Sequence, residues 1–201
     1  HNQYPPMPGI APLREAVAQK IEALYGARYD AGSEITITAG ATQAILTAVL
    51  AVVHPGDEVI VLEPCYDSYG PNIELAGGRV VRVAIAAALN KKTRAIIVNS
   101  PHNPSATVWT RDEMQRLAAL LDPTDTLLIS DEVYEHMVFD GRQHISASTI
   151  PALAARSFVV SSFGKTFHVT GWKIGTVAAP AALSAEFRKV HQFNVFTVNT
   201  P

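Results

Sequence analysis

The chain of 201 residues contains only one cysteine, Cys65, so it has no internal disulfide framework. A single thiol is compatible with a reducing compartment, and we expect a cytoplasmic protein. Long hydrophobic runs are absent too, since the longest, from Ala44 to Val53, is too short to span a bilayer. These shortages argue against a disulfide-stapled secreted scaffold and against a membrane protein.

Charged residues are also scarce, at 17% of the chain. The formal net charge is −2 and basic residues form no block, so neither nucleic acid nor an anionic membrane is an expected partner. The seven histidines show no paired ligand spacing, so no metal site is expected. The first residues, His1 to Pro6, lack an initiator methionine and an export pattern, and they look like the inside of a longer chain.

What the chain does contain is enough apolar sequence, 48% of its residues, for one sizeable core or for one domain with a satellite. We expect strands at 35–38, 58–62, 80–83, 95–98, 126–130, 157–161 and 174–178, and helices at 12–25, 42–53, 73–76, 111–121 and 180–192. The helix at 111–121 has the clearest start, a capping box of Thr110 and Glu113. Alternating strands and helices predict an α/β fold, with a mostly parallel sheet and helices on both faces.

Polar clusters follow several of these strands at their carboxyl ends, which is where ligands bind in such sheets. The clusters are Gly40 to Gln43, Tyr66, Asn103, Asp131 with Tyr134, and Ser162 with Lys165. We therefore expect these residues to form one site.

Lys165 follows the apolar strand at 157–161 and a turn of small residues. A lysine among apolar neighbours loses its proton more easily, because burial penalises the ammonium form, and it is then a candidate to form a Schiff base. A surface lysine in a polar turn is the alternative. The neighbouring clusters favour the reactive lysine.

The segment Gly40-Ala41-Thr42 joins a strand to a helix, and its free backbone amides and small side chains suit a phosphate. An ordinary strand-to-helix turn is the alternative for this segment taken alone. The hydroxyls of Thr42 and Ser162 and the ammonium of Lys173 are candidate further donors to the same phosphate.

Asp131 ends an apolar strand, where a carboxylate can hold a proton on a heterocyclic nitrogen. A helix cap or a structural ion pair is the alternative. Asn103 and Tyr134 are donors suited to a phenolate oxygen. Tyr66 offers an aromatic face to a flat ring, although a core aromatic residue is an equal alternative.

A nucleotide-binding P-loop is the competing hypothesis, because Gly164-Lys165-Thr166 resembles the end of that motif. The segment Leu127 to Glu132 likewise resembles the strand that holds magnesium in such proteins. However, Val159 stands where the P-loop requires a glycine, and the acidic strand comes first in the chain. We favour the site built around the lysine.

Short motifs follow one another along nearly the whole chain: Asn2–Tyr4, Gly40–Gln43, Glu63–Tyr69, Asn99–Pro104, Ser130–Tyr134, Ser162–Lys165, Thr170–Lys173, His191–Phe193 and Thr197–Pro201. In this order they resemble the fold-type I pyridoxal-phosphate-dependent aminotransferases of class I/II. The similarity is to the methionine/kynurenine/glutamine–oxoacid transaminases in particular. The resemblance implies transfer of an amino group from an L-amino acid of methionine, aromatic or glutamine type to a 2-oxo acid.

The resemblance also implies roles for individual residues. Lys165 would be the catalytic lysine, attached to the cofactor pyridoxal 5′-phosphate (PLP) and later moving the proton. Asn103 would touch the substrate carboxylate. Tyr4 would reach the phosphate of the partner subunit, which implies a homodimer. The other implied cofactor contacts are Asp131 to the ring nitrogen, Asn103 and Tyr134 to O3′, Tyr66 to the ring face, and Ala41, Thr42, Ser162 and Lys173 to the phosphate.

The chain departs from the family pattern in three places. Ala106 stands where the family usually has glycine, so that turn is expected to be either strained or locally different. The connection at Ile85 to Leu89 looks shortened. The small domain, which carries the arginine for the substrate carboxylate, is absent, so we interpret residues 1–201 as the PLP-binding large domain of a longer enzyme, itself incomplete. A C–S β-lyase and the PLP-binding effector domain of a transcription regulator are the alternatives.

Overall fold

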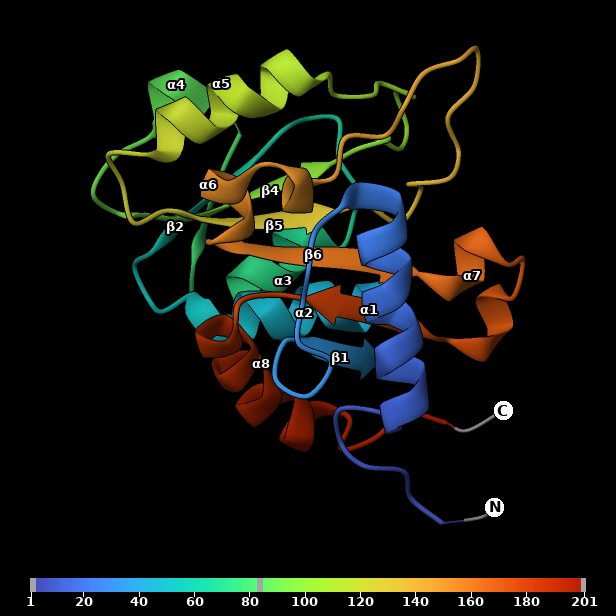
Figure 1. The fold of residues 1–201 in the computed structure, drawn as a ribbon. Helices are drawn as coiled ribbons and strands as arrows, with labels where there is room; N and C mark the ends of the chain where they lie inside the picture. The colour runs from blue at the N-terminus through green and yellow to red at the C-terminus, as the bar shows by residue number, and fades with distance from the viewer. Residues whose placement is uncertain (1–2, 83–84, 200–201) are drawn as a thin grey trace.

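The computed structural model describes residues 3–82 and 85–199. Their centre is a seven-stranded sheet with the order β1-β7-β6-β5-β4-β2-β3 (Figure 1). The strands are β1 (Ile35–Thr38), β2 (Glu58–Val61), β3 (Arg79–Val81), β4 (Thr93–Asn99), β5 (Leu127–Asp131), β6 (Ser157–Ser162) and β7 (Gly175–Ala178). Strand β7 runs antiparallel to both of its neighbours, and the other pairings are parallel.

Helices cover both faces of the sheet. On one face lie α2 (Ala41–Val52), α3 (Tyr69–Leu75) and α8 (Ala181–Asn194), and on the other lie α1 (Ala11–Tyr25), α4 (Ile85–Ala88), α5 (Arg111–Leu121) and α6 (Pro151–Ala154). Side chains along a strand alternate between the two layers: Ile60 belongs to the apolar cluster that includes residues of α1 and α5, while Val59 and Val61 belong to the cluster that includes residues of α2 and α8. The predicted α/β fold with a mostly parallel, doubly covered sheet is confirmed.

Helix α5 begins at the predicted residue, and its capping box is present. The Thr110 amide donates to Glu113 Oε2 at 2.7 Å, and the Glu113 amide donates to Thr110 Oγ1 at 3.3 Å. The structure also contains elements that the sequence did not predict: the short helices α4, α6 and α7 (Phe163–Thr166) and the 3₁₀ turns η1 (Ala147–Thr149) and η2 (Thr170–Trp172). Helices of three or four residues are too short to show a hydrophobic period.

The end of the strand expected at 80–83 falls on residues 83–84, which lie outside the described residues. The connection expected to be shortened, Ile85 to Leu89, contains helix α4, and its Ala88 is buried in the same apolar cluster as residues of α5. None of the described helices is long and apolar enough to cross a bilayer.

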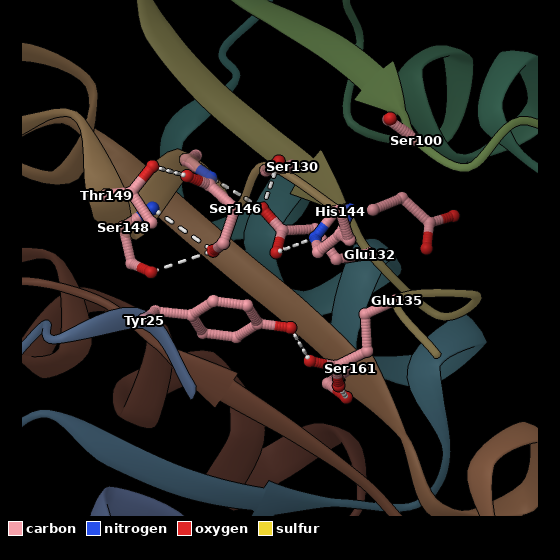
Figure 2. A network of polar contacts seen from close by, with 12 residues as sticks. Tyr25, Ser100, Ser130, Glu132, Glu135, His144, Ser146, Ser148, Thr149 and Ser161 are labelled. Carbon is pink, nitrogen blue, oxygen red and sulfur yellow. Dashed lines mark hydrogen bonds and ion pairs between the residues drawn. The ribbon is translucent and has the colours of Figure 1, made fainter. Parts of the chain in front are cut away.

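A buried polar network ties α1 to the sheet (Figure 2). The Glu135 side chain is only 3% exposed, and Lys20 Nζ lies 2.7 Å from its Oε1. Tyr25 from α1 and Ser161 from β6 donate their hydroxyls to the same carboxylate. Burial by itself raises the pKa of Glu135, but Lys20 and the hydroxyl donors outweigh burial and hold this pKa below its ordinary value.

A second buried carboxylate, Glu132, fastens the segment after β5 (Figure 2). It accepts hydrogen bonds from Ser130 Oγ at 2.8 Å and from the Ala147 amide at 2.9 Å. His144 Nε2 lies 2.8 Å from its other oxygen. The connection from β5 to η1 is therefore anchored beside the strand it leaves.

We predict that Glu135→Ala lowers the free energy of unfolding by about 3 kcal/mol, because the change leaves the Lys20 ammonium and two hydroxyls without their shared acceptor. Urea unfolding followed by circular dichroism measures the loss. Glu186→Ala is the matched control, since Glu186 pairs with Lys189 at 2.6 Å on the exposed side of α8 and the pair should contribute little. Equal unfolding midpoints for the two variants would contradict the prediction.

Candidate active site

A cavity of about 280 Å³ opens at the carboxyl edge of the sheet, between the start of α2 and the ends of β4, β5 and β6. Nine of the ten predicted site residues line it: Ala41, Thr42, Tyr66, Asn103, Asp131, Tyr134, Ser162, Lys165 and Lys173. The expectation that these separate polar clusters share one place is therefore met. Parallel strands explain the convergence, because their carboxyl ends all meet at one edge.

One end of the cavity is suited to an anion. The first turn of α2 has no side-chain cap, so its leading amides have no acceptor within the helix. The Lys173 ammonium and the Ser162 hydroxyl line the same cavity. Lys173 Nζ lies 3.7 Å from the place that a Cβ on Gly40 would take, which sets the cation directly over this turn.

Gly175 on β7 allows this arrangement. A Cβ there would come within 2.8 Å of the Ala41 amide nitrogen and 2.9 Å of the Ser161 carbonyl oxygen. Any larger residue would therefore push the start of α2 away from the sheet. Sequence reasoning did not single out this glycine, because its importance depends on a contact with a segment far away in the chain.

Asp131 lines the same cavity. Its carboxylate is buried, at 4% exposure. Burial raises its pKa to about 6; the hydrogen bonds from the Tyr69 hydroxyl and the Val133 amide act in the opposite direction, and the charge of Glu132 adds to the rise. In this protein the group therefore changes charge close to neutral pH.

Asn103 and Tyr134 lie side by side, with Asn103 Nδ2 3.4 Å from Tyr134 Oη. Asn99 joins Asn103 to the end of β5, since its Oδ1 accepts from the Asn103 amide at 2.9 Å and its Nδ2 donates to the Asp131 carbonyl at 2.8 Å. The sequence analysis gave Asn99 no role. Its signal was a polar residue at the end of an apolar strand, four positions before Asn103.

Tyr66 lines the cavity with its ring 37% exposed, and it meets the buried ring of Tyr69 edge to face at 5.8 Å between centroids. The alternative of a core aromatic residue is therefore wrong for Tyr66. The core aromatic is Tyr69, three residues later in the chain.

Lys165 is exposed rather than buried among apolar neighbours, so that part of the sequence interpretation is wrong. The reason is local: β6 ends at Ser162, and α7 carries the lysine beyond the edge of the sheet. Its Nζ lies 5.8 Å from the centroid of the Tyr134 ring, so the amine still points into the cavity region.

Tyr4 is the predicted site residue that does not line this cavity. Its ring is 80% exposed and meets Phe196 edge to face at 5.4 Å. The Thr197 hydroxyl donates to the Pro5 carbonyl at 3.1 Å, so the two ends of the described chain lie side by side there.

The competing chemistries find little support in the described residues. Strand β6 leads directly into α7, so no glycine-rich loop precedes Lys165 as a P-loop would require. Within residues 3–82 and 85–199, no three histidine, cysteine or acidic side chains are grouped to hold a metal ion.

One known family matches the whole of the chain. Residues 1–201 match the family described as aminotransferase class I and II. The chain belongs to this family.

Individual members of the family resemble this chain over all or nearly all of its length. Methionine aminotransferase of Escherichia coli is 51% identical over 100% of this chain and 55% of its own length. Kynurenine–oxoglutarate transaminase 1 of Homo sapiens is 36% identical over 97% of this chain and 52% of its own length. The chain thus spans about half the length of the curated relatives it matches.

Solved structures show the same relationship. The crystal structure of an Escherichia coli protein identified as a methionine aminotransferase superposes with a TM-score of 0.97, over 100% of this chain and 56% of that one, at 51% identity. Aspartate aminotransferase from Thermus thermophilus gives 0.92, over 98% and 54%, at 32% identity. The alignment with the first relative spans 212 positions, more than the 201 residues here, so some positions of that alignment have no residue in this chain.

Ala106 lies in the loop that carries Asn103, and its φ of 58° places it in the left-handed region. The expected strain at this departure from the family pattern is therefore present. We predict that Ala106→Gly raises the free energy of unfolding by up to about 1 kcal/mol, because glycine has no Cβ to clash in this conformation.

The matched control is Ala155→Gly. Ala155 is exposed, with a φ of −64°, and the change there should lower stability through the entropy of the unfolded chain. Thermal unfolding of both variants measures the two signs. A loss of stability for both would show that Ala106 is not strained.

Proposed function

We propose that this chain is the PLP-binding large domain of an aminotransferase that moves an amino group from an L-amino acid to a 2-oxo acid. The observation that carries the proposal is the single cavity that joins an anion-binding helix start, a buried carboxylate and a lysine amine. The family and the aminotransferase relatives support it.

The donor set fits PLP. The uncapped first turn of α2, with Thr42, Ser162 and Lys173, would bind the dianionic phosphate. Asp131 would face the ring nitrogen, and Tyr66 would lie against the ring. The cavity of about 280 Å³ is close to the lower limit of small-molecule sites, about 300 Å³, which suits one compact ring.

When bound, PLP supplies an electrophilic carbon for amines and an electron-withdrawing ring. The protein has three tasks around it. Asp131, as a carboxylate, would stabilise a proton on the ring nitrogen. Asn103 and Tyr134 would donate hydrogen bonds to the ring oxygen O3′. Lys165 Nζ would be the amine to which the cofactor attaches, and as a free amine it would take the proton from the substrate α-carbon.

The identity of the donor is proposed at the level of its class. Relatives named for methionine and kynurenine support an amino acid of methionine, aromatic or glutamine type. Asn103, at the exposed rim of the cavity, would contact the substrate carboxylate. The rest of the substrate pocket would come from sequence beyond these 201 residues, because the relatives are about twice as long.

We also propose a cytoplasmic homodimer. The exposed Tyr4 ring lies outside the cavity of its own chain and is free to reach the phosphate bound by a partner subunit. The single, unpaired Cys65 is compatible with a reducing cytoplasm.

Lys165→Ala tests the covalent role. In the full-length protein, we expect borohydride reduction of the PLP-loaded wild type to leave one cofactor attached, visible by mass spectrometry, and the variant to retain none. Transamination should fall at least 10³-fold. Lys173→Ala is the control, since it should weaken PLP binding yet retain the attachment at saturating PLP. Covalent attachment that survives in Lys165→Ala would refute the assignment.

From the pKa of Asp131 we predict that PLP affinity depends on pH. Its pKa of about 6 lies above the ordinary value, so the carboxylate that pairs with a protonated ring nitrogen is complete above pH 7 and is lost as the pH falls through 6. PLP affinity, measured by fluorescence quenching, should fall about tenfold more between pH 7 and pH 5 in wild type than in Asp131→Asn. Parallel profiles for the two proteins would contradict this, because the phosphate titrates equally in both.

A further inference from the structure

Tyr69 begins α3 directly behind the cavity, without lining it. The residue is 1% exposed, and its hydroxyl donates to Asp131 Oδ2 at 2.5 Å. Burial, followed by the charge of Asp131, raises the pKa of Tyr69, so the phenol keeps its proton and remains the donor. A hydrogen bond of this length to a carboxylate is of the strong, charge-assisted kind.

The two carboxylate oxygens of Asp131 are held differently. Oδ2 accepts the Tyr69 hydroxyl, while Oδ1 has the weaker bond from the Val133 amide at 3.3 Å. Asp131 also lines the cavity, so the less strongly held oxygen is the one available to a ligand. The Tyr69 ring supports Tyr66 edge to face as well, at 5.8 Å.

We propose that Tyr69 is a positioning residue that keeps the Asp131 side chain in its carboxylate form and turns it toward the ring nitrogen of the cofactor. This inference rests on the proposed function, and it adds to that function a residue that does not touch the cofactor.

The surroundings of Asp131 show why such a donor is needed. Glu132 on the same strand disfavours the charge, as burial does. Lys165, Lys173, Tyr66 and Tyr134 face Asp131 from other elements around the cavity, and none of them makes a hydrogen bond to it among the described residues. Tyr69 is thus the one described side chain that offsets the burial by a direct bond.

Tyr69→Phe removes the hydroxyl and keeps the ring. In the cofactor-free full-length protein, carbon NMR of labelled aspartate, assigned with Asp131→Asn, should show the midpoint of Asp131 rising by about one pH unit, the size expected for a charge-assisted hydrogen bond. The pH below which PLP binding weakens should rise by the same amount. PLP affinity at pH 7 should fall about tenfold.

Tyr25→Phe is the matched control, because Tyr25 also donates to a buried carboxylate, that of Glu135, on the other face of the sheet. Both variants should lose stability, but the control should leave the Asp131 midpoint unchanged. Fluorotyrosine at position 69 provides a second test that preserves the shape: it is a stronger donor, so the Asp131 midpoint should fall.

An unchanged Asp131 midpoint in both position-69 proteins would overturn the inference, and so would equal shifts for Tyr69→Phe and Tyr25→Phe. A wild type that binds no PLP would instead refute the proposed function. In that case the NMR midpoints still decide whether Tyr69 holds the carboxylate.

Discussion

The site depends on one buried negative charge, the carboxylate of Asp131 at the end of β5. An ionised group in such a place is unstable unless neighbouring donors compensate for the lost water. Tyr69 and the Val133 amide supply those donors, and Asn99 fastens the backbone beneath them. A protonated ring nitrogen would be a further donor to the Asp131 carboxylate. The buried charge is therefore expected to be more fully hydrogen-bonded with such a ring bound than without it.

Residues that line the cavity are direct chain neighbours of residues in the polar network under α1. Tyr134 lines the cavity, while its neighbour Glu135 belongs to the polar network under α1. Likewise Ser161 donates to Glu135, and the next residue, Ser162, lines the cavity. Ser161 and Ser162 lie on β6, where successive side chains point to opposite faces, so the network behind the sheet limits the movement of this strand end in front of it.

Much of the site was predictable because it consists of strand ends. Apolar strands show themselves by composition, and a parallel sheet brings their carboxyl ends together, so Asp131, Asn103 and Ser162 could be expected to meet. Tyr69 and Gly175 could not, since one is recognised only by its hydroxyl partner and the other only by a contact across the sheet. The burial of Lys165 was wrongly predicted for a different, local reason: the short helix after β6 leaves no periodic signal.

The sequence by itself determined the α/β class, the start of α5 and the set of polar residues available for the chemistry, because these follow from periodicity, capping and residue type. Only the tertiary structure decided which oxygen of Asp131 is held by Tyr69 and how closely the start of α2 approaches β7. Those properties depend on distances between segments far apart in the chain. No local pattern encodes such distances, since they result from the packing of the whole sheet with its two helical layers.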